Sequence, residues 1–251
     1  MNLLIIQARM GSTRLPGKVL KDINGKTILE NLIERIKPAK TIDKIVVATT
    51  TNKADDAIES FCQQMHITCS RGSDWDVLER FYEAAAPFKP ANVIRVTSDC
   101  PLHHHSVVDF VVNEYKNSGL DYFSNSNHEP DVIEDGFDTE VFSFKALEQA
   151  HQQAKMHSER EHVTPYIKNS GHFKCGWKPF NKEYHYKLSV DSPTDFQAVA
   201  KIFEELKDKP DFGMNEVIDL LKTKPSILDL NKESIANAGY QKSLKNDKPV
   251  K

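Results

Sequence analysis

In the first half of the chain, a short apolar run is followed by a polar turn and a helical apolar pattern four times over. The apolar runs are residues 3–6, 45–48, 66–69 and 92–97. Strands buried on both faces appear as continuous apolar runs, and their alternation with helices is typical of parallel strands joined by helical crossovers. We therefore expect an α/β fold, in which helices cover both faces of a mostly parallel central sheet.

The polar turns that follow these runs are residues 7–18, 49–52, 70–76 and 98–101. Ligands of open α/β sheets bind beyond the carboxyl ends of the strands. The four turns are therefore predicted to meet around one pocket.

The first turn has the composition of an anion-binding loop. Its flexible and charged residues are Gly11, Gly17, Arg9, Arg14 and Lys18. Glycines let backbone N–H groups approach phosphate oxygens, and the basic side chains supply the countercharge. Five residues separate the glycines and Val19 follows Lys18, so this is not a Walker loop, and the dinucleotide GxGxxG pattern is absent. A surface loop with scattered basic residues is the alternative.

One aspartate stands where a ligand-binding edge is expected, and another precedes a predicted helix. Asp99 follows the fourth apolar run, and Mg²⁺ prefers a few carboxylates together with phosphate oxygens. A turn or helix-capping role is the alternative for Asp99. Asp191 precedes a predicted helix that begins with Ser192 and Pro193, and Ser192 can cap that helix without Asp191.

Composition narrows the class of protein. The net charge is −3 with both signs interspersed, so no overall field recruits nucleic acid or an anionic membrane. The four cysteines lack CxxC spacing, which favours reduced thiols in a cytoplasmic protein. The opening apolar run is too short for a signal peptide, and no stretch is long enough to span a bilayer.

The second half of the chain is less regular. We expect a turn-rich connection at 125–136, a strand at 137–144, a capping box at 158–161, two paired strands at 172–177 and 184–190, and a helix at 214–222. The end of the chain is predicted to carry a short helix before Tyr240 and then to fray. The domain boundaries that follow are 1–225 for one domain, with a subregion at about 125–190, and 226–251 for a polar tail.

The stretch A-R-M-G-S-T-R-L-P-G-K resembles the N-terminal motif of the sugar-activating cytidylyltransferases. These include the CMP-Kdo synthetases, the acylneuraminate cytidylyltransferases and the spore-coat polysaccharide branch, which shares the most of the motif. The resemblance implies a nucleotide-diphospho-sugar transferase-like (GT-A-type) fold and a loop that holds the triphosphate of CTP. The implied nucleotide-binding residues are Gln7, Ala8, Arg9, Gly11, Ser12, Thr13, Arg14, Lys18, Thr49, Arg71 and Ser73.

Two further segments imply the metal ligands. V-T-S-D-C-P-L resembles the family's T-G-D-C-P-L, with Ser98 in place of the usual glycine, and L-S-V-D-S-P-T-D-F resembles V-D-T-P-E-D-F. Their matching residues, Asp99 and Asp191, would bind Mg²⁺ or Mn²⁺. Residues 70–73 and 76–80 resemble the part that lines the base and ribose, although Arg80 could equally form a helix-surface ion pair.

Segments 135–142 and 159–166 resemble the family's acceptor-binding and dimer-forming half. Glu140, Arg160 and His162 are therefore candidates for the acceptor pocket, and a packed structural role is the alternative for His162. The three adjacent histidines 103–105 are not expected to chelate one ion, because consecutive side chains project in different directions. One of them could touch the acceptor if it faced the pocket.

The resemblance implies transfer of CMP from CTP to a sugar or sugar-acid acceptor, with release of pyrophosphate, in polysaccharide or glycan precursor synthesis. Arg9, Arg14 and Lys18 would stabilise the charge that builds on the leaving group. A cytoplasmic homodimer is implied, without nucleic-acid or membrane partners. Two alternatives remain: a nucleotide-sugar-dependent glycosyltransferase of the same fold, and a non-catalytic nucleotide-binding protein.

Overall fold

A computed structural model of the chain describes residues 1–126, 135–236 and 238–250. The strands are β1 (Asn2–Gln7), β2 (Asp22–Ile23), β3 (Lys26–Thr27), β4 (Lys44–Thr50), β5 (Thr68–Gly72), β6 (Asn92–Thr97), β7 (Tyr122–Ser124), β8 (Glu140–Ser143) and β9 (Cys175–Trp177). The 3₁₀ helices are η1 (Lys18–Leu20), η2 (Lys53–Asp55) and η3 (Pro225–Leu230). The α-helices are α1 (Ile28–Ile36), α2 (Asp56–Gln64), α3 (Val77–Ala85), α4 (His105–Ser118), α5 (Phe144–Gln153), α6 (His157–His162), α7 (Pro165–Asn169), α8 (Pro193–Glu205), α9 (Met214–Thr223) and α10 (Ala238–Lys245).

Seven strands of the described residues form one mixed, mostly parallel sheet in the order β5-β4-β1-β6-β8-β7-β9. β1 pairs in parallel with β4 and β6, and β4 pairs in parallel with β5. β8 runs antiparallel to both β6 and β7, and β9 returns parallel to β7. The predicted α/β class is thereby confirmed. β2 and β3 form a small hairpin, joined by a turn at Asn24 and Gly25, and both turn residues have positive φ.

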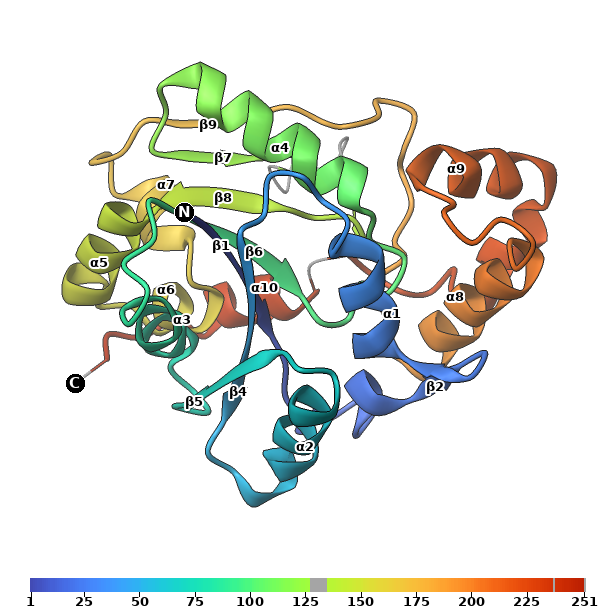
Figure 1. Ribbon diagram of the computed structural model, residues 1–251, viewed down its shortest axis with the longest axis horizontal. Coiled ribbons are helices and arrows are strands. Elements are labelled where there is room, and N and C mark those ends of the chain that lie inside the picture. Colours follow the sequence, from blue (N-terminus) through green and yellow to red (C-terminus); the bar gives the residue numbers. More distant parts are fainter. Residues whose placement is uncertain (127–134, 237, 251) are drawn as a thin grey trace.

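The apolar core follows from the alternation of side chains along the buried strands. In β1, Leu4 and Ile6 face a cluster that includes α1, α2 and α4, whereas Leu3 and Ile5 face a cluster that includes α3 and α5. A third cluster packs α8, α9 and η3 together with Ile23 of β2, Ile28 of α1 and Val107 of α4. Figure 1 shows α8 and α9 on the opposite side of the molecule from α3 and α5.

The predicted elements 172–177 and 184–190 do not pair, which corrects the sequence expectation. β9 covers only Cys175–Trp177 and pairs with β7. Residues 184–190 are not a strand, because their N–H groups bond to other segments: the Ser189 N–H donates to the Asp135 carboxylate over 2.8 Å, and the Leu188 N–H donates to the Asp135 carbonyl. Alternating hydrophobicity alone does not reveal that competition.

Three smaller expectations are also corrected. The N-cap of α6 is Met156, whose N–H donates to the Glu159 carboxylate, whereas Ser158 bonds to Asp247. β8 begins only at Glu140, because the Asn125 side chain bonds the backbone at Phe137 and Thr139. The C-terminal end is not frayed in the described residues: the Val250 N–H donates to the Lys155 carbonyl over 2.7 Å. The predicted connection at 125–136 lies largely outside the described residues.

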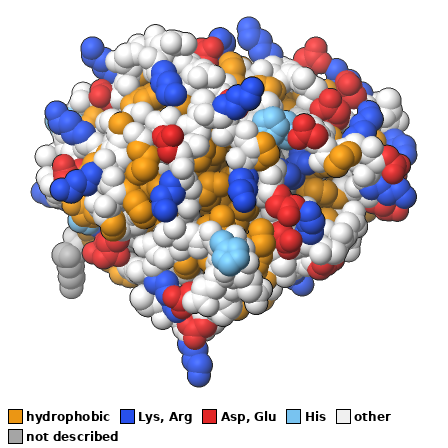
Figure 2. All heavy atoms as spheres, viewed as in Figure 1, with side chains coloured by type: hydrophobic (Ala, Val, Ile, Leu, Met, Phe, Trp, Pro, Cys, Tyr) orange, Lys and Arg blue, Asp and Glu red, His pale blue; other side chains and the backbone are white. Residues whose placement is uncertain are grey.

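Acidic and basic side chains are interspersed on the face drawn in Figure 2, as expected from their interspersion along the sequence. Within the described ranges, no helix combines the length and the apolar character that a membrane span requires.

Candidate active site

Asp99 and Asp191 are brought together by the backbone. Asp99 follows β6, whose carboxyl end lies beside that of β1, and Asp191 precedes α8. The Val190 N–H donates to the Asp99 carbonyl over 2.7 Å, which ties two segments that are far apart in the sequence. Both carboxylates then reach the Lys18 ammonium, at 2.9 Å from Asp99 Oδ2 and 3.0 Å from Asp191 Oδ1. The predicted meeting of these three residues is therefore present.

The charges at this point stabilise one another. Burial by itself would lower the pKa of Lys18, but the carboxylates of Asp99 and Asp191 outweigh it, and the pKa lies above its ordinary value. For Asp99, burial acts to raise the pKa, and the Lys18 ammonium reverses the effect and holds it below the ordinary value. Lys18 and Asp99 are therefore both charged at neutral pH, and the Lys18 ammonium lies between the carboxyl groups of Asp99 and Asp191.

Asp191 carries further basic partners. Arg14 Nη2 lies 3.1 Å from Asp191 Oδ1, and Lys187 Nζ lies 3.3 Å from its Oδ2. Lys187 also contacts the buried Asp195 at 3.0 Å, and Asp195 belongs to the capping box of α8. The Asp191 carboxylate thus lies between Arg14 and Lys187. Through Asp195, Lys187 also contacts the start of α8, a helix that the sequence predicts correctly.

The first loop folds back on itself between β1 and η1. The Gly17 N–H donates to the Met10 carbonyl over 3.0 Å, and Gly17 has a left-handed φ of 68° that favours glycine. Ser12 Oγ accepts from the Leu15 N–H, and the Met10 N–H donates to Asp55 over 2.6 Å. The tip of the loop stays exposed at Gly11, Thr13 and Arg14.

The other predicted nucleotide residues lie around this loop or away from it. Gln7 Oε1 accepts from Arg95, and Ala8 is buried at the end of β1. Arg9 pairs with Asp74 at 3.2 Å, with both side chains about half exposed. Their roles toward a nucleotide stay predictions.

Two of these residues sit on strands rather than in the loops that were expected. Arg71 belongs to β5, and its guanidinium pairs with Asp56 and Glu59 of α2, each at 2.8 Å. Thr49 of β4 is fully buried. Ser73 follows β5, and its Oγ accepts from the Asp76 N–H. None of the contacts described for these three residues reaches Lys18, Asp99 or Asp191, and their nucleotide-binding roles stay predictions.

Arg80 is a buried cation beside the first loop. Only 2% of it is exposed, so the surface ion pair considered from the sequence is wrong. Burial, followed by repulsion from Arg9, lowers its pKa to about 10. Its Nη1 donates to the Ser73 carbonyl, and its Nε has no hydrogen-bond partner in the described part of the chain. The sequence signal that could have predicted its burial is its position on the apolar face of α3, three residues after Val77.

A cavity of about 230 Å³ adjoins the paired aspartates. Its lining includes Asp99, Asp191, Arg14, Glu140 and His162, so two of the three predicted acceptor residues face the same space as the predicted metal ligands. The third, Arg160, does not line it. The Arg160 guanidinium pairs with Asp76 at 2.6 Å and donates to the His151 carbonyl, which fastens α6 to the start of α3.

Glu140 is already saturated with partners. It pairs with Arg95 and accepts hydrogen bonds from the Tyr122 hydroxyl at 2.6 Å and from Thr164 Oγ1 at 2.7 Å. Burial acts to raise its pKa, but Arg95 and then Lys168 hold it below the ordinary value. Glu140 is therefore an anion that fixes the cavity wall.

His162 and Tyr240 also line this cavity. Burial lowers the pKa of His162 to about 4, so its imidazole is neutral at pH 7. Its ring meets Tyr240 of α10 edge-on, with centroids 5.0 Å apart. Tyr240 also lines a second cavity of about 260 Å³, which shares Ser126 and Lys168 with the first. Sequence reasoning missed Tyr240 and Lys168, because neither belongs to a chemical motif.

Comparisons with known proteins identify the family of the chain. A family model described as cytidylyltransferase matches residues 3–235. An uncharacterized protein of Methanocaldococcus jannaschii is 38% identical over 90% of this chain and 93% of its own length. The spore coat polysaccharide biosynthesis protein SpsF of Bacillus subtilis is 30% identical over 89% of this chain and 95% of its own.

Solved structures give the same result. A cytidylyltransferase of Leptospira borgpetersenii superposes with a TM-score of 0.83 at 31% identity, covering 90% of this chain and 95% of that one. A CMP:2-keto-3-deoxy-manno-octonic acid synthetase complexed with CTP gives a TM-score of 0.60 at 17% identity, covering 81% and 98%, which shows the shared fold. From the family match and these relatives, the chain belongs to the cytidylyltransferase family.

Proposed function

We propose that this cytidylyltransferase transfers CMP from CTP to a sugar or sugar-acid acceptor and releases pyrophosphate, in the synthesis of a cell-surface polysaccharide or glycan precursor. The observation that carries the proposal is the convergence of Asp99 and Asp191 on Lys18 at the wall of a cavity. The name of the Bacillus subtilis relative supports the polysaccharide context. A cytoplasmic homodimer is part of the proposal, and sedimentation of the purified protein tests the dimer.

The two aspartates fit a hard divalent cation such as Mg²⁺ or Mn²⁺. Their oxygens already converge on one positive group, the Lys18 ammonium, and such ions prefer carboxylate ligands that leave room for phosphate oxygens. When bound, the ion would neutralise phosphate charge and align the acceptor with the nucleotide.

The basic residues of the first loop would bind the triphosphate. Arg9 and Arg14 are each about half exposed and are held by single carboxylates, Asp74 and Asp191, so a phosphate can compete for them. In the reaction, a bond forms between the acceptor oxygen and the α-phosphorus, the acceptor hydroxyl releases its proton to solvent, and the bond from that phosphorus to the bridging oxygen breaks. Lys18, Arg9 and Arg14 would stabilise the negative charge that moves onto the leaving pyrophosphate.

The acceptor would lie in the cavity next to the aspartates. Because Glu140 is saturated by Tyr122, Thr164 and Arg95, we assign it to holding these groups in place. His162, neutral and on the cavity wall, is available to contact the acceptor directly. Arg160, which pairs with Asp76, would act by positioning α6.

A pyrophosphate-release screen of four nucleotides against sugar acids, amino sugars and phosphorylated acceptors tests the proposal. We expect release with CTP, and a loss of about a hundredfold or more in turnover for Asp99→Asn and for Asp191→Asn. Asp229→Asn, an exposed aspartate on η3, is the matched control and should retain wild-type turnover. Absence of release with every pair, or full activity in Asp99→Asn, would contradict the assignment.

Nucleotide affinity tests the loop separately. Lys18→Ala should weaken CTP binding by about tenfold or more, because it removes a charged partner of the triphosphate. Lys21→Ala, whose side chain is exposed just beyond η1, is the control. Equal CTP affinity in the two variants would show that Lys18 does not bind the triphosphate.

A further inference from the structure

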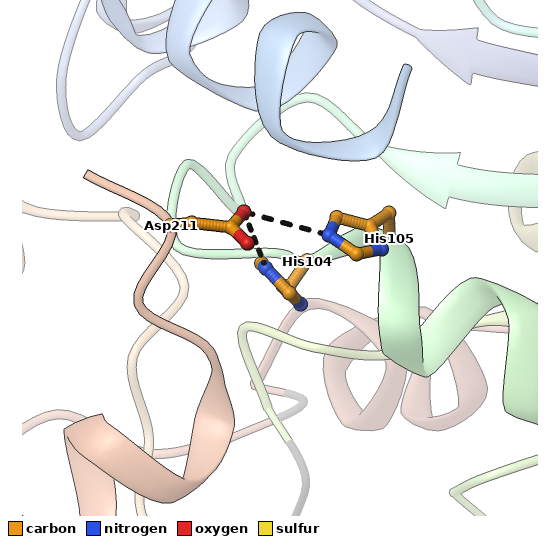
Figure 3. Close-up of side chains that lie close together, drawn as sticks. All are labelled: His104, His105 and Asp211. Atoms are coloured by element: carbon orange, nitrogen blue, oxygen red, sulfur yellow. Dashed lines mark hydrogen bonds and ion pairs between the residues drawn. The ribbon is translucent and has the colours of Figure 1, made fainter. Parts of the chain in front are cut away.

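Three side chains with metal-binding atoms meet where α4 begins, apart from the site described above. His104 Nε2 lies 3.2 Å from Asp211 Oδ1, and His105 Nε2 lies 3.4 Å from the same oxygen. The two imidazole rings are 4.0 Å apart between centroids. Figure 3 shows both rings turned toward the carboxylate of Asp211, which comes from the segment before α9.

The backbone explains how adjacent histidines converge. His104 is the N-cap of α4, with an extended conformation at φ −135° and ψ 144°, whereas His105 is the first helical residue. This change of conformation between neighbours directs both rings to one side, contrary to the expectation from the sequence. His103 turns inward instead, where its Nε2 lies 2.8 Å from Thr139 Oγ1, so it is not part of the group.

Arg35 holds the two segments that carry these side chains. Its guanidinium donates to the carbonyls of Leu102 and His103, each at 3.2 Å, and also to the carbonyl of Phe212. It lies over the Phe212 ring, 3.9 Å from the centroid. The turn before α4 and the residue next to Asp211 are therefore fixed to one side chain of α1. The three groups are positioned in advance of any ligand.

The spacing matches a tetrahedral transition-metal site. With bonds of about 2.0–2.1 Å, neighbouring ligand atoms of tetrahedral Zn²⁺ are about 3.3 Å apart. Asp211 Oδ1 lies 3.2 Å and 3.4 Å from the Nε2 atoms of His104 and His105, and one ligand atom from each of the three residues lies within 4.8 Å of the other two. Asp211 is 82% exposed, which leaves the remaining ligand position open to water. His104 Nδ1 caps α4 by accepting from the Ser106 N–H over 3.3 Å. It also lies 2.8 Å from Ser106 Oγ, which can accept a hydrogen bond from Nδ1–H in the tautomer that frees Nε2 for a metal.

We propose that His104, His105 and Asp211 bind a divalent transition-metal ion, with Zn²⁺ as the best fit. Two imidazoles and one carboxylate favour Zn²⁺, Co²⁺ or Ni²⁺ over Mg²⁺, so the site selects a different ion from the paired aspartates. The positive charge of Arg35 lies near His104 and repels a bound metal ion, which keeps the affinity of the site for the metal moderate. The ion cross-links the start of α4 to the segment before α9 and stabilises their contact.

Titration of tag-free, chelator-treated protein with Zn²⁺, and with Co²⁺ followed by its visible absorption, tests the site. We expect Asp211→Asn and His105→Ala to raise the dissociation constant by about tenfold or more. Asp211 is highly exposed, so its variant should fold, and Zn²⁺ should raise the thermal midpoint of the wild type but not of Asp211→Asn. His172→Ala, at an exposed histidine elsewhere, should bind like the wild type.

Asp99→Asn separates this site from the proposed catalytic one, because it should leave Zn²⁺ binding intact. Unchanged Zn²⁺ affinity in Asp211→Asn, or no binding by the wild type, overturns the proposal. A sulfur-to-cobalt charge-transfer band would also overturn it, because it assigns the ion to a thiol such as the exposed Cys175.

Discussion

Single buried or partly buried side chains decide much of the chemistry of this protein. His162 is kept neutral in the cavity wall, and Asp99 and Glu140 are kept ionised by neighbouring cations. The cause in each case is a balance between burial, which disfavours charge, and a close partner of opposite sign. His162 has the weaker partner, because Glu161 lies 3.6 Å away.

We predict that His162 makes stability fall in mild acid. Its folded pKa of about 4 is below the ordinary value of 6.5, so the unfolded chain takes up a proton first as the pH drops. The stability it contributes is complete above pH 6.5 and is lost toward pH 4, at no more than about 1.4 kcal/mol per pH unit. Urea unfolding at pH 7.5 and 5.0 measures this loss.

His162→Gln should show a smaller loss between the two pH values than the wild type. His185→Gln, at an exposed histidine, should keep the wild-type dependence. If both variants lose as much stability as the wild type, burial of His162 is not the cause.

At the residue scale, motifs predict Lys18, Asp99 and Asp191 correctly as neighbours, because fixed spacings accompany the ends of predicted strands. Burial and pairing across the fold are not encoded locally. Arg160 has the appearance of a pocket residue, but Asp76 neutralises it from another helix. Arg80 has the appearance of a surface residue, but it lies in the interior.

Helix starts are the elements that position the site most directly. The Ser192 side chain accepts from the Asp195 N–H. The Asp195 carboxylate in turn accepts from the Ser192 N–H and forms an ion pair with Lys187. Because Asp191 immediately precedes this cap and shares Lys187, the stability of the helix start and the orientation of the carboxylate are linked.

Ser192→Ala is expected to lower the free energy of unfolding by about 1 kcal/mol, because an N–H at the start of α8 loses its acceptor. Denaturant unfolding measures the change, with Ser226→Ala at an exposed position of η3 as the control. Equal stability in the two variants would show that the Ser192 cap contributes nothing.

Among the elements, the central parallel strands were predictable because burial on both faces produces continuous apolar runs. β7 and β9 have three residues each, too few for a pattern. Residues 184–190 alternate as a strand would, but the side chain and carbonyl of Asp135 occupy their N–H groups. Short strands, and segments whose N–H groups bond outside a sheet, depend on partners that are distant in the sequence.

At the scale of the whole molecule, the C-terminal helix α10 lies beside the cavity that adjoins Asp99 and Asp191. α10 packs beside α6, where Ser243 Oγ donates to Glu161 over 2.7 Å, and Tyr240 faces both cavities. The last described helix of the chain therefore forms part of the cavity wall.

Removal of residues 238–251 should raise KM for the acceptor by about tenfold while leaving CTP affinity unchanged, because the Tyr240 contact with His162 is lost. This expectation depends on the proposed function and is measured by steady-state kinetics with each substrate varied. Leu244→Ala, an exposed change on the same helix, is the control. A change in CTP affinity instead would assign α10 to the nucleotide side.

The hydrogen bond between the Val190 N–H and the Asp99 carbonyl has a consequence for how such a protein diversifies. Main-chain atoms make this link, so exchanging either carboxylate for another side chain leaves it in place. Evolution, or a protein engineer, can therefore vary the reactive groups at this junction while inheriting its architecture unaltered.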